Sequence, residues 1–366
     1  MNEDIYPSDF KNSQQVFPKF SRPSVIGHFS VDADRNVAHD LSQLKFLHMP
    51  ACMTNIGFNL NNGINQTVHK DEKAHEEKLD HLLKFIVYNR KQLCSPAATT
   101  NLINFDIVCF RGLLTKLMCT PFENREGWNI LAQNWKGTTY LCAWESEKSK
   151  MKRLKDIKYQ RKFMSWGYKF EQFLLSSSPQ RKPDITIPVI ESEEFCCVFK
   201  SKLDDLRLFY GAEMDGINTT NLYFNFKDLD KAQFVELKTN RIITTENQSR
   251  NFKKIKSMKW WCQSFLVGID EILCGCRDDN GILLEIKPYK VKDIPKNNDN
   301  FWSATDCMNF CKEVLYFMQK IARTHQNQTI LFSWNPGDKI TYEIDNDKNF
   351  LPTWYLETMS KEDDII

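Results

Sequence analysis

Two stretches, Tyr210-Gly-Ala-Glu-Met-Asp-Gly216 and Phe234-Val-Glu-Leu-Lys-Thr239, carry the pattern that decides the fold of this chain. In each stretch, charged residues two positions apart flank one apolar residue, within a run that predicts a β-strand. Side chains at positions i and i+2 of a strand point to the same face. If the two strands pair, their charged side chains converge on one patch of a sheet. These side chains are Glu213, Asp215, Glu236 and Lys238.

Such a patch predicts a metal-dependent site that cleaves phosphodiesters. Three carboxylates at this density repel one another unless a cation lies among them, and hard ions such as Mg²⁺ prefer oxygen ligands. Upstream, Gly167-Tyr-Lys-Phe-Glu171 adds an acid at the start of a helix expected over 168–175. A helix acid, a strand acid, an acid-x-Lys strand and a following helix occur in this order in restriction-type and lambda-exonuclease-type nucleases.

The chemistry of those nucleases suggests a role for each group. The acids hold one or two cations, which polarise the scissile phosphate and lower the pKa of the attacking water. A lysine positions the nucleophile or neutralises charge that builds on the phosphate. A backbone carbonyl, that of Leu237, could complete the ligand set. Either acidic triplet alone is common on solvated strand faces, so the hypothesis depends on their combination.

Composition narrows the alternatives. The chain has 366 residues, of which 42% are hydrophobic, so it can fill a large core. With 49 basic and 47 acidic residues, the formal net charge of +2 argues against a broad electrostatic grip on duplex nucleic acid but permits a local basic channel. We find no signal peptide and no apolar run of membrane-spanning length. The 12 cysteines are scattered, which favours reduced, mostly buried thiols.

The order of expected elements indicates one α+β domain with a large mixed sheet. We expect a flexible N-terminal segment over residues 1–23, a nuclease domain over 24–358 and a flexible tail over 359–366. Helices are expected at 70–93, 168–175, 256–266 and 303–323. Strands are expected at 24–30, 106–110, 138–142, 187–190, 195–200, 206–210, 212–215, 222–226, 234–237, 271–276, 282–289, 329–334 and 340–343.

Several motifs, in this order, resemble the DXO family of RNA 5′-end decapping nucleases, the decapping and exoribonuclease proteins. The resemblance extends from about residue 24 to 358. The motifs that carry it are Phe-Arg-Gly-Leu-Leu-Thr-Lys-Leu (110–117), Gly-Tyr-Lys-Phe-Glu-Gln (167–172), Glu-Met-Asp (213–215), Glu-Leu-Lys-Thr (236–239), Lys-Trp-Trp-Cys-Gln-Ser-Phe-Leu (259–266), Cys-Met-Asn-Phe-Cys (307–311) and Phe-Ser-Trp-Asn-Pro-Gly (332–337).

The resemblance implies two mixed β-sheets flanked by helices, with a restriction/lambda-exonuclease-like core and two divalent ions, Mg²⁺ or Mn²⁺, in a deep pocket. It implies a role for each site residue as well. Glu171, Asp215, Glu236 and the Leu237 carbonyl would bind metal directly, and Glu213 would act largely through metal-bound water. Lys238 and Gln263 would lie near the scissile phosphate, and Arg111 would contact the 5′ end of the substrate.

The implied function is removal of incompletely methylated, triphosphate and NAD-type 5′ ends from RNA, which leaves a 5′-monophosphate. A 5′-to-3′ exoribonuclease activity, a 5′-to-3′ exoribonuclease partner and residence in the nucleus are further expectations from relatives, and no membrane association is expected. Two alternatives stay open at this point. The chain could be a DNA nuclease with the same metal core, or a non-catalytic RNA-end-binding partner of a processive exonuclease.

Overall fold

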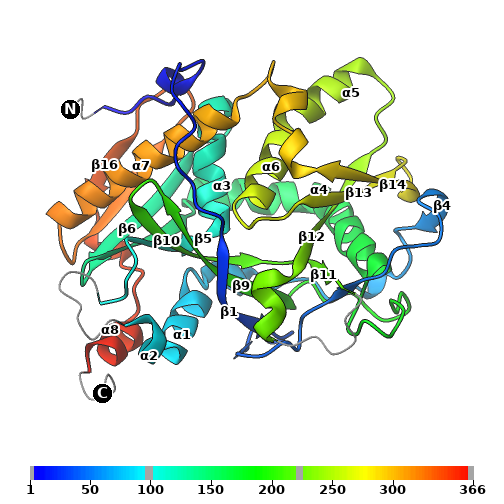
Figure 1. Cartoon of the computed structure of the whole chain (residues 1–366), viewed down its shortest axis with the longest axis horizontal. Helices are drawn as coiled ribbons and strands as arrows, with labels where there is room; N and C mark the ends of the chain where they lie inside the picture. The colour runs from blue at the N-terminus through cyan, green and yellow to red at the C-terminus, as the bar shows by residue number, and fades with distance from the viewer. Residues whose placement is uncertain (1–3, 95–101, 220–225, 362–366) are drawn as a thin grey trace.

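The computed structural model describes residues 4–94, 102–219 and 226–361, and the strands within these ranges form two mixed sheets (Figure 1). The larger sheet has the order β16 (Thr341–Ile344), β15 (Thr329–Trp334), β6 (Trp128–Trp135), β7 (Thr138–Trp144), β5 (Ile107–Phe110), β10 (Leu206–Glu213), β9 (Glu194–Leu203), β1 (Ser24–Val31) and β2 (Val37–Ala38). The smaller has the order β4 (Thr54–Asn59), β14 (Ile282–Lys290), β13 (Glu271–Arg277), β12 (Gln233–Arg241), β11 (Gly216–Asn218), β3 (Phe46–Leu47) and β8 (Leu175–Ser176).

Helices cover both sheets (Figure 1). They are α1 (Asp80–Tyr88), α2 (Arg90–Leu93), α3 (Arg111–Cys119), α4 (Glu147–Leu174), α5 (Glu246–Asn251), α6 (Ser257–Phe265), α7 (Ala304–Thr324) and α8 (Thr353–Ser360). A π-helix, Phe252–Lys256, joins α5 to α6 without interruption. This α+β architecture confirms the fold class expected from the sequence, with two sheets as the family resemblance implied.

Three hydrophobic clusters hold these layers together. The largest lies between the two sheets and includes residues of α3, α6 and α7, such as Leu117, Cys262 and Val314. A second cluster covers the other face of the larger sheet and is closed by α1 and α8. In the third, α4 packs on the smaller sheet through Trp166 and Phe170, both fully buried. Burial of such aromatic side chains is a major source of the stability of the fold.

The chain crosses from the larger sheet to the smaller one at Met214 and Asp215. Strand β10 ends at Glu213, and β11 begins at Gly216 and pairs antiparallel with β12, Gly216 opposite Val235. Direct pairing of the two acidic strands was therefore wrong, because the segment that pairs with β12 is the one that follows Asp215. The acidic residues meet where the chain changes sheets.

Several predicted elements differ from those observed. The helix expected over 168–175 begins much earlier, because α4 runs for 28 residues from Glu147, directly after its N-cap Ser146. The helix expected over 70–93 is divided into a short 3₁₀ segment, α1 and α2. The strand expected at 187–190 is reduced to a single bridge between Val68 and Ile190. Most of the strand expected at 222–226 lies outside the described residues.

The N-terminal segment differs most from expectation. Instead of being flexible, residues 4–23 pack along the domain, where Asp306 accepts hydrogen bonds from the Asn12 N–H (3.0 Å) and the Ser13 hydroxyl (3.1 Å). Phe10 packs edge-on against Phe310, with ring centroids 5.2 Å apart. Polar composition suggested a mobile segment, but these contacts to α7 come from residues almost 300 positions away. At the other terminus, α8 extends to Ser360, so the expected tail begins inside a helix.

Two further findings concern expectations from composition. Every cysteine is free, and all but Cys52 are buried, which confirms the expectation of reduced, mostly buried thiols. Of the helices within the described ranges, not one combines the length and apolar character that a membrane span needs.

Candidate active site

Four carboxylates from three parts of the chain meet at the crossover between the sheets. Glu171 comes from the last turn of α4, Glu213 and Asp215 flank the crossover, and Glu236 lies on β12. They lie close enough to interact, because the charges of Asp215, Glu213 and Glu236 all raise the pKa of Glu171. The structure therefore brings together all the acids that the sequence singled out, although it leaves their chemical roles as predictions.

Two cations face Glu236, the most buried of these acids, with 3% of its surface exposed. Lys238 forms an ion pair with Glu236 Oε1, and Arg111 Nη1 lies 4.0 Å from Oε2. Burial opposes ionisation of Glu236, but the charges of Lys238 and then Arg111 outweigh it, and the pKa of Glu236 is lowered. In return, Glu236 and Asp215 overcome the effect of burial on Lys238 and raise its pKa. Both partners therefore stay charged.

Asp215 is fixed by the main chain of β12. Its Oδ2 accepts a 2.6 Å hydrogen bond from the N–H of Leu237. The N–H and C=O of one strand residue point to the same edge of the strand. The Leu237 carbonyl therefore points to the edge at which Asp215 lies, past the end of β11, and this orientation suits the ligand role expected for it.

For the remaining carboxylates, nearby cations do not offset burial and like charge. Burial, followed by the charges of Asp215 and Glu213, raises the pKa of Glu171 well above its usual value. Burial and the charge of Glu236 raise the pKa of Asp215 to about 7. The Glu213 side chain is open to solvent, yet desolvation by the surrounding protein and the charge of Glu194 raise its pKa to about 7 as well.

This donor set fits hard divalent cations. The four carboxylates outnumber the two cations Lys238 and Arg111, which leaves an excess of negative charge. Repulsion among the carboxylates contributes to the raised pKa values, and a bound cation would relieve it. Carboxylate and carbonyl oxygens are the ligands that Mg²⁺ and Mn²⁺ prefer. Within the described ranges, no three acidic, histidine or cysteine side chains stand at metal-holding separations. Glu236 is paired with Lys238, and Asp215 accepts a hydrogen bond from Leu237.

Arg111 and Gln263 are joined through the main chain. Arg111 is the first residue of α3, and its Nη1 donates a 3.0 Å hydrogen bond to the carbonyl of Gln263 on α6. This contact aims the guanidinium toward Glu236 and places Gln263, which is half-buried, beside the site. A guanidinium has five N–H donors, so donors remain for a substrate phosphate.

Sequence reasoning missed a second charged layer beside Glu213. Glu194, the first residue of β9, forms ion pairs with Lys70 and with Arg35, the latter at 3.0 Å. Arg35 also binds Glu77 through two hydrogen bonds of 2.8 and 2.7 Å. The acid-rich run Glu191-Ser-Glu-Glu194 was a possible signal, but nothing in it indicates that Lys70 lies opposite. His81, whose Nδ1 lies 3.6 Å from Glu77 Oε2, is buried in this layer.

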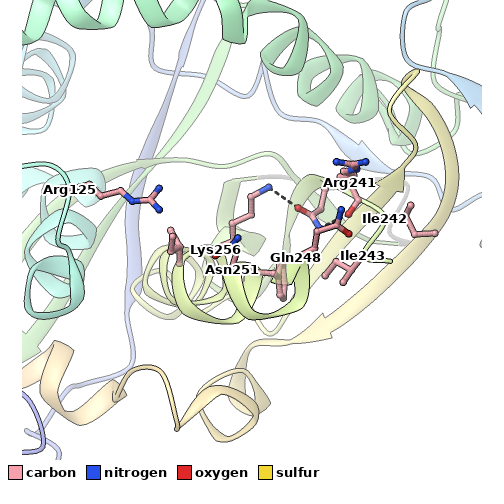
Figure 2. A pocket seen from close by; sticks show the side chains of 10 residues that line it. Arg125, Arg241, Ile242, Ile243, Gln248, Asn251 and Lys256 are labelled. Atoms are coloured by element: carbon pink, nitrogen blue, oxygen red, sulfur yellow. Dashed lines mark hydrogen bonds between the residues drawn. The ribbon is translucent and has the colours of Figure 1, made fainter. Parts of the chain in front are cut away.

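Pockets lie on two sides of the charged cluster. One of about 360 Å³ is lined by Gly112 and Leu113 next to Arg111 and by Glu194 of the second layer. Another, of about 410 Å³, opens at the far end of β12, beyond Lys238, and its wall includes Asn240 and Arg241 (Figure 2). Lys238 is thus followed along its own strand by a cavity.

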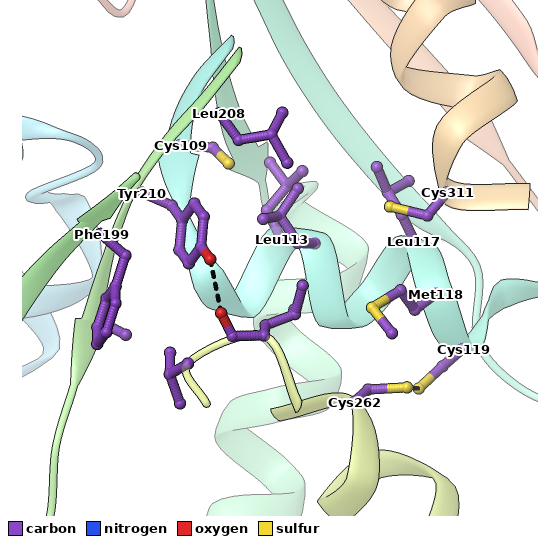
Figure 3. Packing of buried hydrophobic residues seen from close by; sticks show 14 of the residues in the cluster. Cys109, Leu113, Leu117, Met118, Cys119, Phe199, Leu208, Tyr210, Cys262 and Cys311 are labelled. Atoms are coloured by element: carbon purple, nitrogen blue, oxygen red, sulfur yellow. Dashed lines mark hydrogen bonds between the residues drawn. The ribbon is translucent and has the colours of Figure 1, made fainter. Parts of the chain in front are cut away.

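A tightly packed core supports the two helices that carry Arg111 and Gln263 (Figure 3). The Tyr210 hydroxyl of β10 donates a 2.6 Å hydrogen bond to the carbonyl of Leu266, which ends α6. Cys119 of α3 and Cys262 of α6 bring their sulfur atoms to 3.8 Å, and both thiols are buried. Burial at this density restricts side-chain movement, so the site rests on a rigid base.

Comparison with known proteins shows the family to which the sequence is similar. The model of the family described as RAI1-like PD-(D/E)XK nuclease matches residues 21–356. The chain is 33% identical to the human decapping and exoribonuclease protein, over 97% of this chain and 90% of the human one. It is 32% identical to the decapping and exoribonuclease protein of Xenopus laevis, over 95% of this chain and 88% of that protein.

Solved structures share the fold. Candida albicans Rai1, in complex with pU5 and Mn²⁺, superposes with a TM-score of 0.82 at 21% identity, covering 95% of this chain and 97% of that one. Scheffersomyces stipitis Rai1, in complex with (3′-NADP)⁺ and calcium ion, gives a TM-score of 0.81 at 20% identity, covering 95% and 96%. On the match of sequence over nearly its whole length, the chain belongs to the RAI1-like PD-(D/E)XK nuclease family.

Proposed function

We propose that this protein is a divalent-metal-dependent hydrolase that removes incompletely methylated, triphosphate and NAD-type groups from RNA 5′ ends. It leaves 5′-monophosphate RNA, in the quality control and decay of mRNA. One observation carries the proposal: four carboxylates, Lys238 and Arg111 converge at the crossover between the sheets of a decapping-nuclease fold. Relatives named decapping and exoribonuclease proteins cover nearly all of this chain.

The acids supply the cation site. Glu171, Asp215, Glu236 and the Leu237 carbonyl would hold two divalent ions directly, and Glu213 would hold a water of their hydration shell. When bound, the ions supply Lewis acidity at the scissile phosphate and water of lowered pKa. The short hydrogen bond between Leu237 and Asp215 fixes one ligand before any ion arrives, so less ordering is left to binding.

The cations of the chain act on the substrate. Lys238 lies on the same face as Glu236, where its ammonium can neutralise charge that builds on the phosphate. Arg111, held by the Gln263 carbonyl, presents a fork that suits the phosphates of a 5′ end. In our proposal, the side-chain amide of Gln263, whose carbonyl holds Arg111, positions the same phosphate.

Three finer points extend the proposal. Hydrolysis of the next phosphodiester at the same site would give 5′-to-3′ exoribonuclease activity, which the name of the relatives supports. We further propose a 5′-to-3′ exoribonuclease as partner and residence in the nucleus. Support for these last two comes from family membership alone, and co-purification and a fluorescent fusion would test them.

Turnover of defined RNAs tests the main proposal. RNAs of one sequence with a triphosphate, unmethylated guanosine or NAD-type end are incubated with Mg²⁺ or Mn²⁺, and the released species is identified by mass. We expect pyrophosphate or an intact cap fragment, and no release by Glu236→Ala. Equal cleavage of DNA of the same sequence would favour a DNA nuclease. Tight binding of the RNAs without turnover would favour a non-catalytic end-binding protein.

A further inference from the structure

The pocket beyond Lys238 is built from three segments. Its walls are the end of β12, the helix α5 with the π-helix that follows it, and Arg125 from the loop before β6 (Figure 2). The cavity measures about 410 Å³, within the range of pockets that hold small organic groups.

This pocket shares one face of β12 with the active site. Glu236, Lys238 and Asn240 are spaced by two, and their strand pairs with β13 without interruption from Glu236 to Arg241, so the three side chains point the same way. Asn240 lines the pocket. At about 3.3 Å per residue, it lies about 7 Å beyond Lys238. An RNA strand that leaves the active site along β12 would reach the pocket after one or two nucleotides.

The charge of the pocket suits a polyanion. Its ten lining residues include three cations and no acid. Lys256 Nζ donates a 2.7 Å hydrogen bond to Asn240 Oδ1, which fixes the ammonium and leaves two further N–H donors. Arg241 forms an ion pair with Asp279, with Nη2 2.6 Å from Oδ2, so Arg125 and Lys256 are the stronger candidates for phosphate contact.

The lining of this pocket also suits a base. The half-buried Phe252 and Ile255 line it together with the exposed Ile243, and an aromatic ring gives a base a surface for stacking. Phe252, Ile255 and Lys256 all belong to the π-helix, a feature that re-aims side chains and recurs at functional sites. The Trp302 indole holds this turn by donating to the Lys253 carbonyl at 3.1 Å.

The pocket on the Arg111 side differs in character. Its lining includes Glu77 and Glu194 beside Arg35, so it does not favour a chain of phosphates. The two sides of the site are thus chemically unequal, with the acid-free, basic cavity on the Lys238 side.

We propose that the pocket at the end of β12 binds a nucleotide of the RNA body, downstream of the scissile bond. Arg125 and Lys256 contact its phosphate, and Phe252 and Ile255 pack against its base. This inference rests on the proposed function, because it assigns a path to the substrate of the same site. If the pocket binds the RNA body, its contribution to affinity depends on RNA length and not on the chemistry of the 5′ end.

Binding tests the pocket independently of turnover. A 5′-monophosphate dinucleotide and a 12-nucleotide single strand, both labelled at the 3′ end, are titrated by anisotropy into full-length Glu171→Gln protein, which does not consume them. Arg125→Ala and Lys256→Ala are added singly to this background. Lys254→Ala is the matched control, since Lys254 is an exposed lysine of the same π-helix that does not line the pocket.

We expect each pocket variant to weaken binding of the long strand about fivefold to tenfold and to flatten its log-affinity against log-salt slope by about 0.7, the value for one phosphate contact on a single strand. The pocket variants should change the affinity for the dinucleotide less than about twofold. Lys254→Ala should change the affinity for either ligand less than about twofold. Long-strand affinities equal to those of Lys254→Ala overturn the inference. An equal loss on the dinucleotide overturns it too, because the pocket would then serve the 5′ end. Failure of the wild type to cleave any RNA contradicts the proposed function but leaves these affinities interpretable.

Discussion

The main-chain N–H of Leu237 donates a 2.6 Å hydrogen bond to Oδ2 of Asp215, and this contact ties the crossover between the sheets to the strand that carries Glu236 and Lys238. Leu237 itself is buried under α4 in a hydrophobic cluster that includes Phe170, the neighbour of Glu171. One strand residue thus connects three elements of the site through its side chain and its main chain.

Glu171→Gln should separate activity from stability. Burial and then the like charges of Asp215 and Glu213 raise the pKa of the wild-type carboxyl, so an uncharged isostere removes an unfavourable ionisable group from the metal-free protein. We expect a melting temperature in EDTA equal to or above that of the wild type. Hydrolysis should fall about 100-fold or more, because a proposed metal ligand is lost. Calorimetry and single-turnover kinetics measure the two effects.

Glu147→Gln, at the exposed start of the same helix, is the control for charge removal and should keep full activity. A drop of several degrees in the EDTA melting temperature of Glu171→Gln would show that Glu171 is a structural residue.

Lys238→Met should lower the rate of the chemical step about 100- to 1,000-fold, the range for loss of one electrostatic donor at a transition state. The pKa of Glu236 should rise, because Lys238 is the leading cause of its depression. Single-turnover rates at saturating RNA report the loss. Lys290→Met, an exposed lysine at the end of β14, should behave as wild type. If both variants turn over equally fast, Lys238 has no part in the reaction.

Gly275→Ala should destabilise the protein by about 1–3 kcal/mol through overpacking. A Cβ at this position of β13 would lie 2.7 Å from Phe170 Cε2 and 2.9 Å from Leu283 Cδ1. Since Phe170 precedes Glu171, relief of the clash should displace the helix that carries this proposed metal ligand, and activity should fall as well. Urea unfolding measures the cost.

Gly167→Ala on α4 is the opposite case. No atom lies within 4 Å of its added Cβ, so the substitution should stabilise the helix by about 0.5–1 kcal/mol. A Gly275→Ala variant as stable as the wild type would mean that the packing of α4 on β13 is looser than described.

Histidines with lowered pKa values should contribute a loss of stability as the pH falls below about 6.5. Burial lowers the pKa of His81, and the same cause lowers the pKa values of His28 and His39. In this window these imidazoles bind protons in the unfolded chain but not in the folded one, so their contribution to the free energy of unfolding falls as pH decreases. The slope is up to about 1.4 kcal/mol per pH unit for each imidazole that stays neutral. Glu171, Glu213 and Asp215 contribute in the opposite direction, because their raised pKa values make the folded chain bind protons first.

His81→Gln removes one of these histidines, so as the pH falls from 7 to 5.5 the unfolding free energy of the variant should rise relative to that of the wild type. Urea titrations at several pH values give both slopes. Identical slopes would mean that the Glu77 carboxylate, 3.6 Å from His81 Nδ1, already holds the ring protonated in the folded state.

Much of the site could be predicted because its pattern is local. Alternation along β12 places Glu236 and Lys238 on one face and the buried Val235 and Leu237 on the other, as expected from the spacing alone. The order of the acidic motifs sufficed to identify the family. Charged residues within a strand pattern are informative since few other roles explain them.

Contacts between distant segments could not be predicted in the same way. The ion pair of Lys70 with Glu194 joins residues 124 positions apart, and the N-terminal segment is held by Asp306 from almost the other end of the chain. Local composition indicated mobility for that segment because it contains no periodic apolar pattern. Its order comes from partners that only the folded domain presents.

The sequence by itself singled out the candidate site residues and placed Glu236 and Lys238 on one face of β12, because strand periodicity is a property of neighbouring residues. Only the tertiary structure decided that the two acidic stretches lie in different sheets and meet at Asp215, and that β12 leads from Lys238 into a basic pocket. Those features depend on how long-range burial and hydrogen bonding bring separate segments together, and no short window of residues contains that information.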